Sequence, residues 1–169
     1  RLLAPKPKAA GELAQPKNLI VLLIDTLRAD RLKPYTPSSR VKTPALDDIA
    51  KRGTVFEWAI SPENWTKPSV ASVLTGLYPQ THGARKMESV LGQKALLISE
   101  HLKAHGFATG SFIANGYVSD RFGFDQGWDH YTNFIRERKN TDAEYLFREA
   151  ADWIETKKDG RFFAYVHTI

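Results

Sequence analysis

The feature of this sequence that most constrains its fold is a run of six apolar residues, Leu19 to Ile24, that ends in a carboxylate at Asp25. A continuously apolar run of this length is typical of a strand that helices cover on both faces. Ligands of open α/β sheets gather at the carboxyl ends of the strands. Asp25 is therefore a candidate metal or substrate ligand, and the alternative is a cap for the following turn.

The rest of the chain alternates between helical and extended patterns, which predicts an α/β fold with a central, mostly parallel sheet. Thr43 and Pro44 are typical of a helix start, and Gly53 of its end. The further segments that we predict are a strand over 54–59, a helix over 69–75, a helix over 94–105, a strand over 107–114, a loop over 115–134, a helix over 142–157 and a strand over 162–169.

Composition narrows the function classes. The chain has no cysteine, which excludes disulfides and thiolate metal sites. No apolar stretch approaches the length of about 18 residues that spans a membrane. The net charge of +5 suits an anionic substrate. It is not concentrated in a basic stripe, which argues against nucleic acid as a partner.

The two ends of the sequence suggest a part of a larger protein. Residues 1–17 are rich in Pro, Ala and Lys without a clear period and are expected to form a leader or linker. Such a leader is compatible with an exported, periplasmic or membrane-anchored protein. The last predicted strand closes at Ile169 with nothing after it, although central strands rarely end as free termini. We therefore expect a further C-terminal part of the same protein; the oligomeric state does not follow from the sequence.

A second candidate site is the segment Asn64-Trp65-Thr66-Lys67-Pro68-Ser69, which precedes a helical run of small and apolar residues. Thr66 would lie at a helix N-terminus, where free N–H groups and the helix dipole favour an anion. A hydroxyl at such a place becomes a nucleophile when a divalent metal also binds it. The alternative is that Thr66 or Ser69 only caps the helix.

Five motifs in series resemble the sulfatase family of the alkaline phosphatase superfamily. They are IDTLRADRL from Ile24, TPALDDIA from Thr43, GTVF from Gly53, TKPSVASVLTGLYP from Thr66 with His82-Gly83 after it, and FGFDQGWD from Phe122. The resemblance covers residues 18–169 and implies the N-terminal part of a catalytic domain with an alkaline-phosphatase-like α/β sandwich, incomplete at the C-terminus.

The resemblance also assigns roles to individual residues. Asp25 falls on a metal-binding aspartate and Thr66 on the nucleophile, a metal-bound oxygen that forms a covalent intermediate. Lys67 stands beside it, where it could offset charge on the substrate. His167 lies in a segment similar to the strand before an active-site loop, so it is a substrate-binding candidate; a packed histidine at a strand end is the alternative.

Two further residues, Asn115 and Thr26, bear on substrate and metal binding. Asn115 follows a predicted strand as Asp25 does, and is a weaker candidate for binding substrate. Thr26 replaces the second aspartate that many sulfatases have, which leaves Asp25 as the clear metal ligand. The other ligands of the family's metal would come from beyond Ile169, since divalent metals need about four to six ligands.

The identity of residue 66 selects among activities. Sulfatases of this pattern carry a Cys or Ser that is converted to formylglycine, and Thr66 cannot be converted by that route. The resemblance therefore favours the branch that acts on phosphate-type esters through a threonine nucleophile, with Mn²⁺ or Zn²⁺ as cofactor. The alternatives are a sulfuric ester hydrolase without formylglycine, for which Ca²⁺ is expected, and a non-catalytic fragment with a structural or binding role.

Overall fold

The computed structural model of the protein describes residues 17–169, so most of the leader expected over 1–17 lies outside the described residues. Within them, four parallel strands form one sheet in the order β1-β4-β2-β3. The strands are β1 (Asn18–Ile24), β2 (Ala108–Ile113), β3 (His130–Asn133) and β4 (Phe162–Thr168). The expectation of an α/β fold with a parallel central sheet is confirmed.

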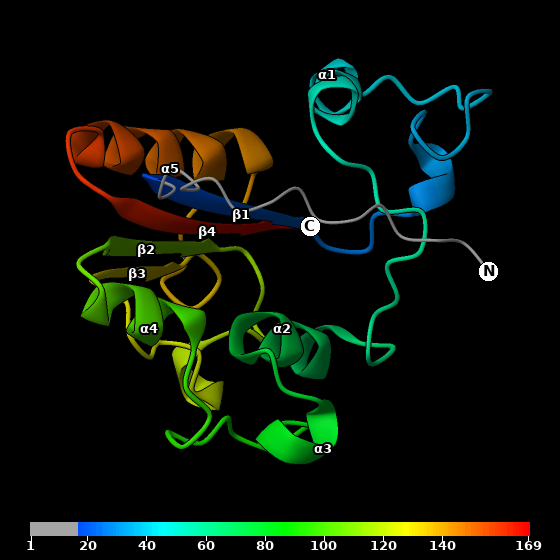
Figure 1. The fold of residues 1–169 in the computed structure, drawn as a ribbon. Coiled ribbons are helices and arrows are strands. Elements are labelled where there is room, and N and C mark those ends of the chain that lie inside the picture. The colour runs from blue at the N-terminus through cyan, green and yellow to red at the C-terminus, as the bar shows by residue number, and fades with distance from the viewer. Residues whose placement is uncertain (1–16) are drawn as a thin grey trace, which may run out of the picture.

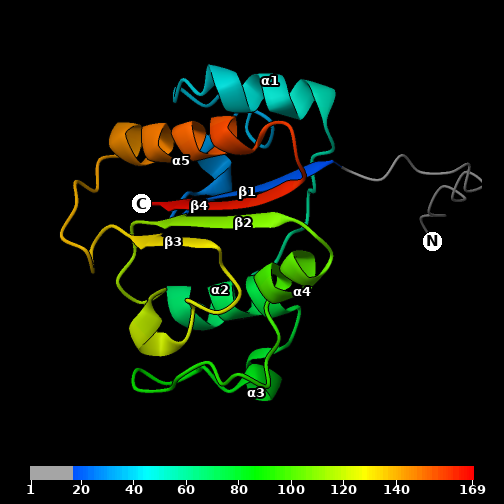
Figure 2. The same ribbon diagram turned by 90° about the vertical axis from the view of Figure 1, so that its left-hand side faces the viewer.

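Helices cover both faces of this sheet, so the molecule has three layers (Figure 1). One face carries α5 (Ala143–Lys157), which packs on β2 and β4. The opposite face carries α2 (Thr66–Thr75) and α4 (Ile98–Ala104), with the short α3 (Pro79–His82) beyond them (Figure 2). The remaining elements are η1 (Ala29–Arg31), η2 (Asp120–Phe122) and α1 (Pro44–Arg52).

The burial of β4 follows from its place between β1 and β2. All seven of its residues are buried, because α5 lies over one face and α2 and α4 lie under the other. Alternate side chains enter two cores, with Phe163 and Tyr165 on the α2 side and Val166 on the α5 side. The strand predicted over 162–169 is therefore confirmed, and so are the helices predicted over 44–52 and 142–157.

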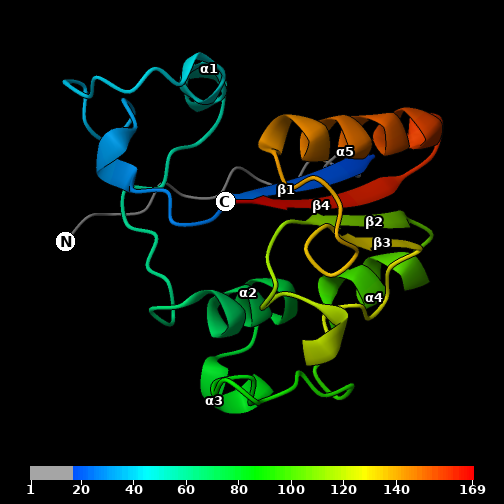
Figure 3. The same ribbon diagram turned by 180° about the vertical axis from the view of Figure 1, so that it is seen from behind.

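The segment from η1 through α1 stands apart from these layers (Figure 3). The strand predicted over 54–59 is wrong: residues 51–60 are all exposed, and the structure shows no strand beside them, within the described residues, to pair with. Trp58 is 87% exposed. Separately, none of the helices in residues 17–169 is both long and apolar enough to cross a bilayer.

Three other predicted boundaries need correction. Helix α2 begins at Thr66 rather than Ser69, since Pro68 is tolerated in a first helical turn. Helix α4 begins at Ile98 rather than Lys94, because the Glu100 carboxylate accepts the Leu97 N–H at 2.8 Å and fixes the start. The loop predicted over 115–134 contains β3, a short and largely polar strand without the pattern that marks a strand in sequence.

Candidate active site

Asp25 lies directly after β1, at the edge of the sheet where all the parallel strands end (Figure 1). Its backbone N–H donates to the Thr168 carbonyl at 2.8 Å, which extends the pairing of β1 with β4 by one residue. The next residue, Thr26, has φ of 58°, a left-handed conformation that costs a β-branched residue about 1–3 kcal/mol. The turn after Asp25 is thus strained, as backbone at functional sites often is.

The carboxylate of Asp25 is the meeting point of three side chains from separate parts of the chain. Its Oδ2 accepts hydrogen bonds from Thr66 Oγ1 at 3.0 Å and Asn115 Nδ2 at 3.0 Å, and lies 3.2 Å from His167 Nε2. These partners come from the start of α2, the end of β2 and the end of β4. The structure therefore brings together four residues that the sequence singled out separately.

Thr66 is the first residue of α2, and its hydroxyl donates a hydrogen bond to Asp25 instead of capping the helix. The N-cap position belongs to Trp65, which makes no side-chain capping bond. Ser69 donates its hydroxyl to the carbonyls of Glu63 and Trp65. The reading of Thr66 or Ser69 as an N-cap is therefore wrong. The first N–H groups of α2 stay free of side-chain capping, close to the Thr66 hydroxyl.

The hydrogen-bond partners of His167 indicate which of its ring nitrogens carries a proton. An ionised carboxylate only accepts, so Nε2 carries the hydrogen that faces Asp25. Nδ1 lies 3.1 Å from the Tyr165 hydroxyl and is then the acceptor for that group. Burial lowers the pKa of His167, although the bond to Asp25 opposes the shift. Burial together with the charge of Asp25 raises the pKa of Tyr165, which keeps its hydroxyl a donor.

Asn115 is held through both ends of its side-chain amide and through its backbone carbonyl. Its Nδ2 donates to Asp25, and its Oδ1 accepts the Tyr117 N–H at 2.8 Å. The buried Asn133 donates from Nδ2 to the carbonyls of Asn115 and Val118, at 3.0 and 2.9 Å. The sequence analysis missed Asn133 and Tyr165. Asn133 ends a strand at the same sheet edge, and Tyr165 precedes His167 by the two-residue period of a strand, so both signals existed.

Lys67 has a different setting from its neighbour Thr66. Its side chain is fully buried, and Nζ donates to the carbonyls of Met87 at 2.7 Å and Ser89 at 2.8 Å. The ammonium also lies 4.1 Å from the centre of the Phe122 ring. Burial lowers its pKa, with the charge of Glu88 acting in the opposite direction. Lys67 is thus not among the side chains that bind Asp25.

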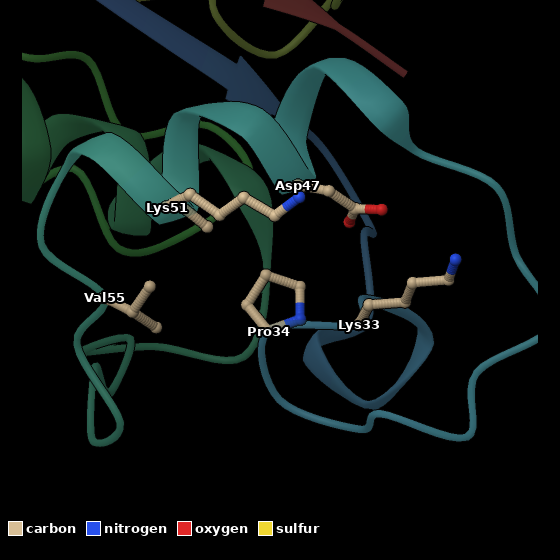
Figure 4. A pocket seen from close by; sticks show the side chains of 6 residues that line it. Lys33, Pro34, Asp47, Lys51 and Val55 are labelled. Atoms are coloured by element: carbon tan, nitrogen blue, oxygen red, sulfur yellow. The ribbon is translucent and has the colours of Figure 1, made fainter.

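A hollow of about 420 Å³ opens beside Asp25 and Thr66. Its other lining residues include Thr26, Trp65 and Ser69. Another hollow of about 420 Å³ lies between Lys33 and α1 (Figure 4). Its charged side chains are one carboxylate and two ammonium groups, without a hydroxyl or an imidazole. Of these two hollows, only the first is lined by the Asp25 carboxylate and the Thr66 hydroxyl.

The donor set at Asp25 suits part of a metal site. The carboxylate and the hydroxyl are acceptable ligands for a divalent cation, whereas both ring nitrogens of His167 are engaged with Asp25 and Tyr165. Residues 17–169 nevertheless contain no group of three His, Cys, Asp or Glu side chains that could hold a metal. Asp25 and Thr66 can therefore contribute ligands, and a complete site needs others.

The fold matches solved structures along most of the chain. The crystal structure of the phosphonate monoester hydrolase of Agrobacterium radiobacter superposes with a TM-score of 0.74. The match covers 92% of this chain and 41% of that one, at 18% identity, a level that speaks for the fold alone. The class defined by this fold is the alkaline-phosphatase-like α/β sandwich.

The profile of the family described as Sulfatase matches residues 17–169, and the chain therefore belongs to the sulfatase family. An ulvan-active sulfatase of Formosa agariphila is 26% identical over 95% of this chain and 29% of its own length. The multifunctional alkaline phosphatase superfamily protein PehA of Trinickia caryophylli is 31% identical over 54% of this chain and 18% of its own. The chain thus spans less than a third of either relative.

Proposed function

We propose that the protein is a metal-dependent hydrolase that cleaves a phosphate-type ester with Thr66 as its nucleophile. The observation that carries the proposal is the bond from Thr66 Oγ1 to Asp25 Oδ2 at 3.0 Å, at the N-terminal end of a ten-residue helix. Membership of the sulfatase family and the likeness to PehA, an alkaline phosphatase superfamily protein, support it.

Each residue of the candidate site would have a separate role in such a reaction. Asp25 orients the Thr66 hydroxyl by accepting its hydrogen bond. Asn115 and His167 donate to the same oxygen and so fix the orientation of the carboxylate. The N–H groups at the start of α2 favour an anionic ester group beside Thr66.

A cofactor completes the proposal. A divalent cation, Mn²⁺ or Zn²⁺, would supply positive charge that lowers the pKa of the Thr66 hydroxyl. Asp25 and Thr66 would hold it, together with ligands from a further part of the protein, for which the relatives' greater lengths leave room. Asn115, which lines a neighbouring hollow, would help to position the substrate, and the buried His167 would act through Asp25.

A substrate panel with matched variants tests this function in the full-length protein. The substrates are bis(4-nitrophenyl) phosphate, 4-nitrophenyl phenylphosphonate and 4-nitrophenyl sulfate, each with Mn²⁺, Zn²⁺ or Ca²⁺ and after chelation. We expect the phosphorus esters to react faster than the sulfate, and chelation to stop the reaction. Thr66→Ala should lower kcat at least about a thousandfold with metal content retained, whereas Thr66→Ser should keep part of the activity.

Thr75→Ala is the matched control, because the Thr75 hydroxyl bonds only within its own helix end, to the Ala71 carbonyl and the Leu77 N–H. It should leave kcat unchanged. Full turnover by Thr66→Ala would contradict the assignment of Thr66 as the nucleophile. Preference for the sulfate ester would favour the second candidate, a sulfatase without formylglycine, which the name of the Formosa relative supports. No turnover and no metal binding would favour a structural or binding role.

A further inference from the structure

A third hollow, of about 570 Å³, is lined in part by Asn115, whose side chain donates to Asp25. We call it the Arg121 hollow; its lining includes Glu88, Asn115, Tyr117, Arg121, Phe122 and Arg136. Most of its lining is apolar or aromatic, and its charged groups lie among these surfaces. Such a mixture suits a ligand with an apolar body and a charged group.

The Arg121 hollow is joined to the candidate active site through two contacts. Asn115 lines it and also donates to Asp25 Oδ2 at 3.0 Å. Tyr117 lines it and meets Trp65, a residue of the Thr66 hollow, edge to face with ring centres 5.8 Å apart. Asn115 and the Trp65–Tyr117 pair therefore lie at the boundary between the two hollows, which places the Arg121 hollow next to the candidate active site.

The Arg121 hollow has a buried cation next to its aromatic lining. Lys67 is fully buried, and no carboxylate of residues 17–169 lies within ion-pair distance of its ammonium. Its nearest ring is Phe122, which lines the hollow, with Nζ 4.1 Å from the ring centre. Carbonyl oxygens and a ring stabilise this ammonium without cancelling its net charge, so the adjacent space is favourable to an anion.

Two guanidinium groups stand at this hollow, and they differ in their partners. Arg136 is paired with Asp120, with Nε to Oδ1 at 3.0 Å. Arg121 lies against the Phe122 ring at 5.4 Å and has no carboxylate partner within the described part of the chain. Glu88 is the one acidic side chain among the lining residues. Arg121 is thus the exposed cation that is free to bind an anionic group of a ligand.

We propose that the Arg121 hollow binds the non-reacting part of the ester, and that this part is an apolar or aromatic group with a second negative charge that Arg121 contacts. The proposal rests on the proposed function, since it places the ester group at Thr66. It adds the substrate class: an ester that carries a second anionic group, such as a carboxylate, phosphate or sulfate, on an apolar body.

The test compares two esters with one leaving group in the full-length protein. They are 4-nitrophenyl phenylphosphonate and its 4-carboxyphenyl counterpart, which differ only in the non-reacting ring. We expect the wild type to show a KM about tenfold lower for the carboxylated ester, the effect of one charge-assisted hydrogen bond. Arg121→Gln should remove that preference by raising the KM of the carboxylated ester alone, with both kcat values unchanged. Arg121→Lys should keep part of it.

Arg148→Gln is the matched control, because Arg148 lies on α5 and pairs with Glu144 at 3.2 Å, and it should leave both KM values unchanged. Equal KM values in the wild type, or an equal rise of both in Arg121→Gln, would overturn the proposal. If the wild type hydrolyses neither ester, the proposed function fails. The role of the Arg121 hollow is then tested by calorimetry with 4-carboxyphenylphosphonate and phenylphosphonate. Tighter binding of the carboxylated compound by the wild type, lost in Arg121→Gln, would support the proposal. Equal binding of the two compounds would overturn it.

Discussion

At the scale of single residues, Oδ2 of Asp25 is the shared acceptor of three side chains that lie 41, 90 and 142 positions away in sequence. The carboxylate therefore ties the start of α2 to the ends of β2 and β4. Its removal would leave the donors of Thr66, Asn115 and His167 without an acceptor, and buried donors without partners are costly. The same oxygen thus supports the fold and the proposed chemistry.

The hydroxyl of Tyr165 is expected to contribute to this arrangement through His167. Tyr165→Phe keeps the ring and removes the bond to Nδ1, which leaves a buried acceptor unsatisfied. We expect the free energy of unfolding to fall by about 1–2 kcal/mol, measured by urea denaturation followed by tryptophan fluorescence. The control is Tyr35→Phe, whose exposed hydroxyl bonds the Phe56 carbonyl, and which should cost less than about 0.5 kcal/mol. An equal effect of the two changes would contradict the role of Tyr165.

The sequence predicted these residues to different degrees. Asp25, Asn115 and His167 were found at or near strand ends, and their meeting follows from the common edge of a parallel sheet. Thr66 stood out as a nucleophile only through family resemblance, because its local sequence equally suits a cap. The partners of Lys67 were not predictable, since the carbonyls of Met87 and Ser89 lie 20 and 22 residues away in a segment without periodic pattern.

At the scale of elements, the packing of α5 on the sheet depends on a glycine in β2. A Cβ added at Gly110 would meet the Trp153 ring at 2.9 Å, so the indole lies directly on the backbone of the strand. Trp153 also contacts Phe112 and Phe162, the side chains around it on that face. The sequence predicts the helix that carries Trp153, but not the strand that this side chain meets.

We therefore expect Gly110→Ala to displace Trp153 and lower the free energy of unfolding by about 1–3 kcal/mol, because close-packed cores tolerate added volume poorly. Urea denaturation measures the change. Gly92→Ala is the control, since a Cβ there meets no atom within 4 Å, and it should change stability by less than about 0.5 kcal/mol. An unchanged midpoint for Gly110→Ala would show that α5 is not held closely against β2.

At the scale of the whole molecule, the order of the strands places the candidate site residues at one edge of the sheet. The residues at or just after the ends of β1, β2 and β4 meet at one edge because these strands are parallel neighbours. The segment from η1 to residue 60 leaves those layers, and its apolar side chains, including Trp58 and Ile60, stay exposed. Sequence patterns predicted α5 and the central strand β4 of the layers well, because the spacing of apolar residues in a helix or strand follows which of its faces are buried. They failed at 54–59, where an extended pattern has no neighbouring strand within the described residues.

The central claim is that Thr66 is the nucleophile of this layered site, and the most direct test is to find the substrate's group on its side chain. The full-length protein would be mixed with bis(4-nitrophenyl) phosphate and Mn²⁺, quenched in acid within one turnover and mapped by peptide mass spectrometry. The account predicts a phosphoryl ester on Thr66 in the wild type and none on that peptide in Thr66→Ala. Turnover without modification at Thr66, or with modification at Ser69 or Ser72 instead, would contradict it.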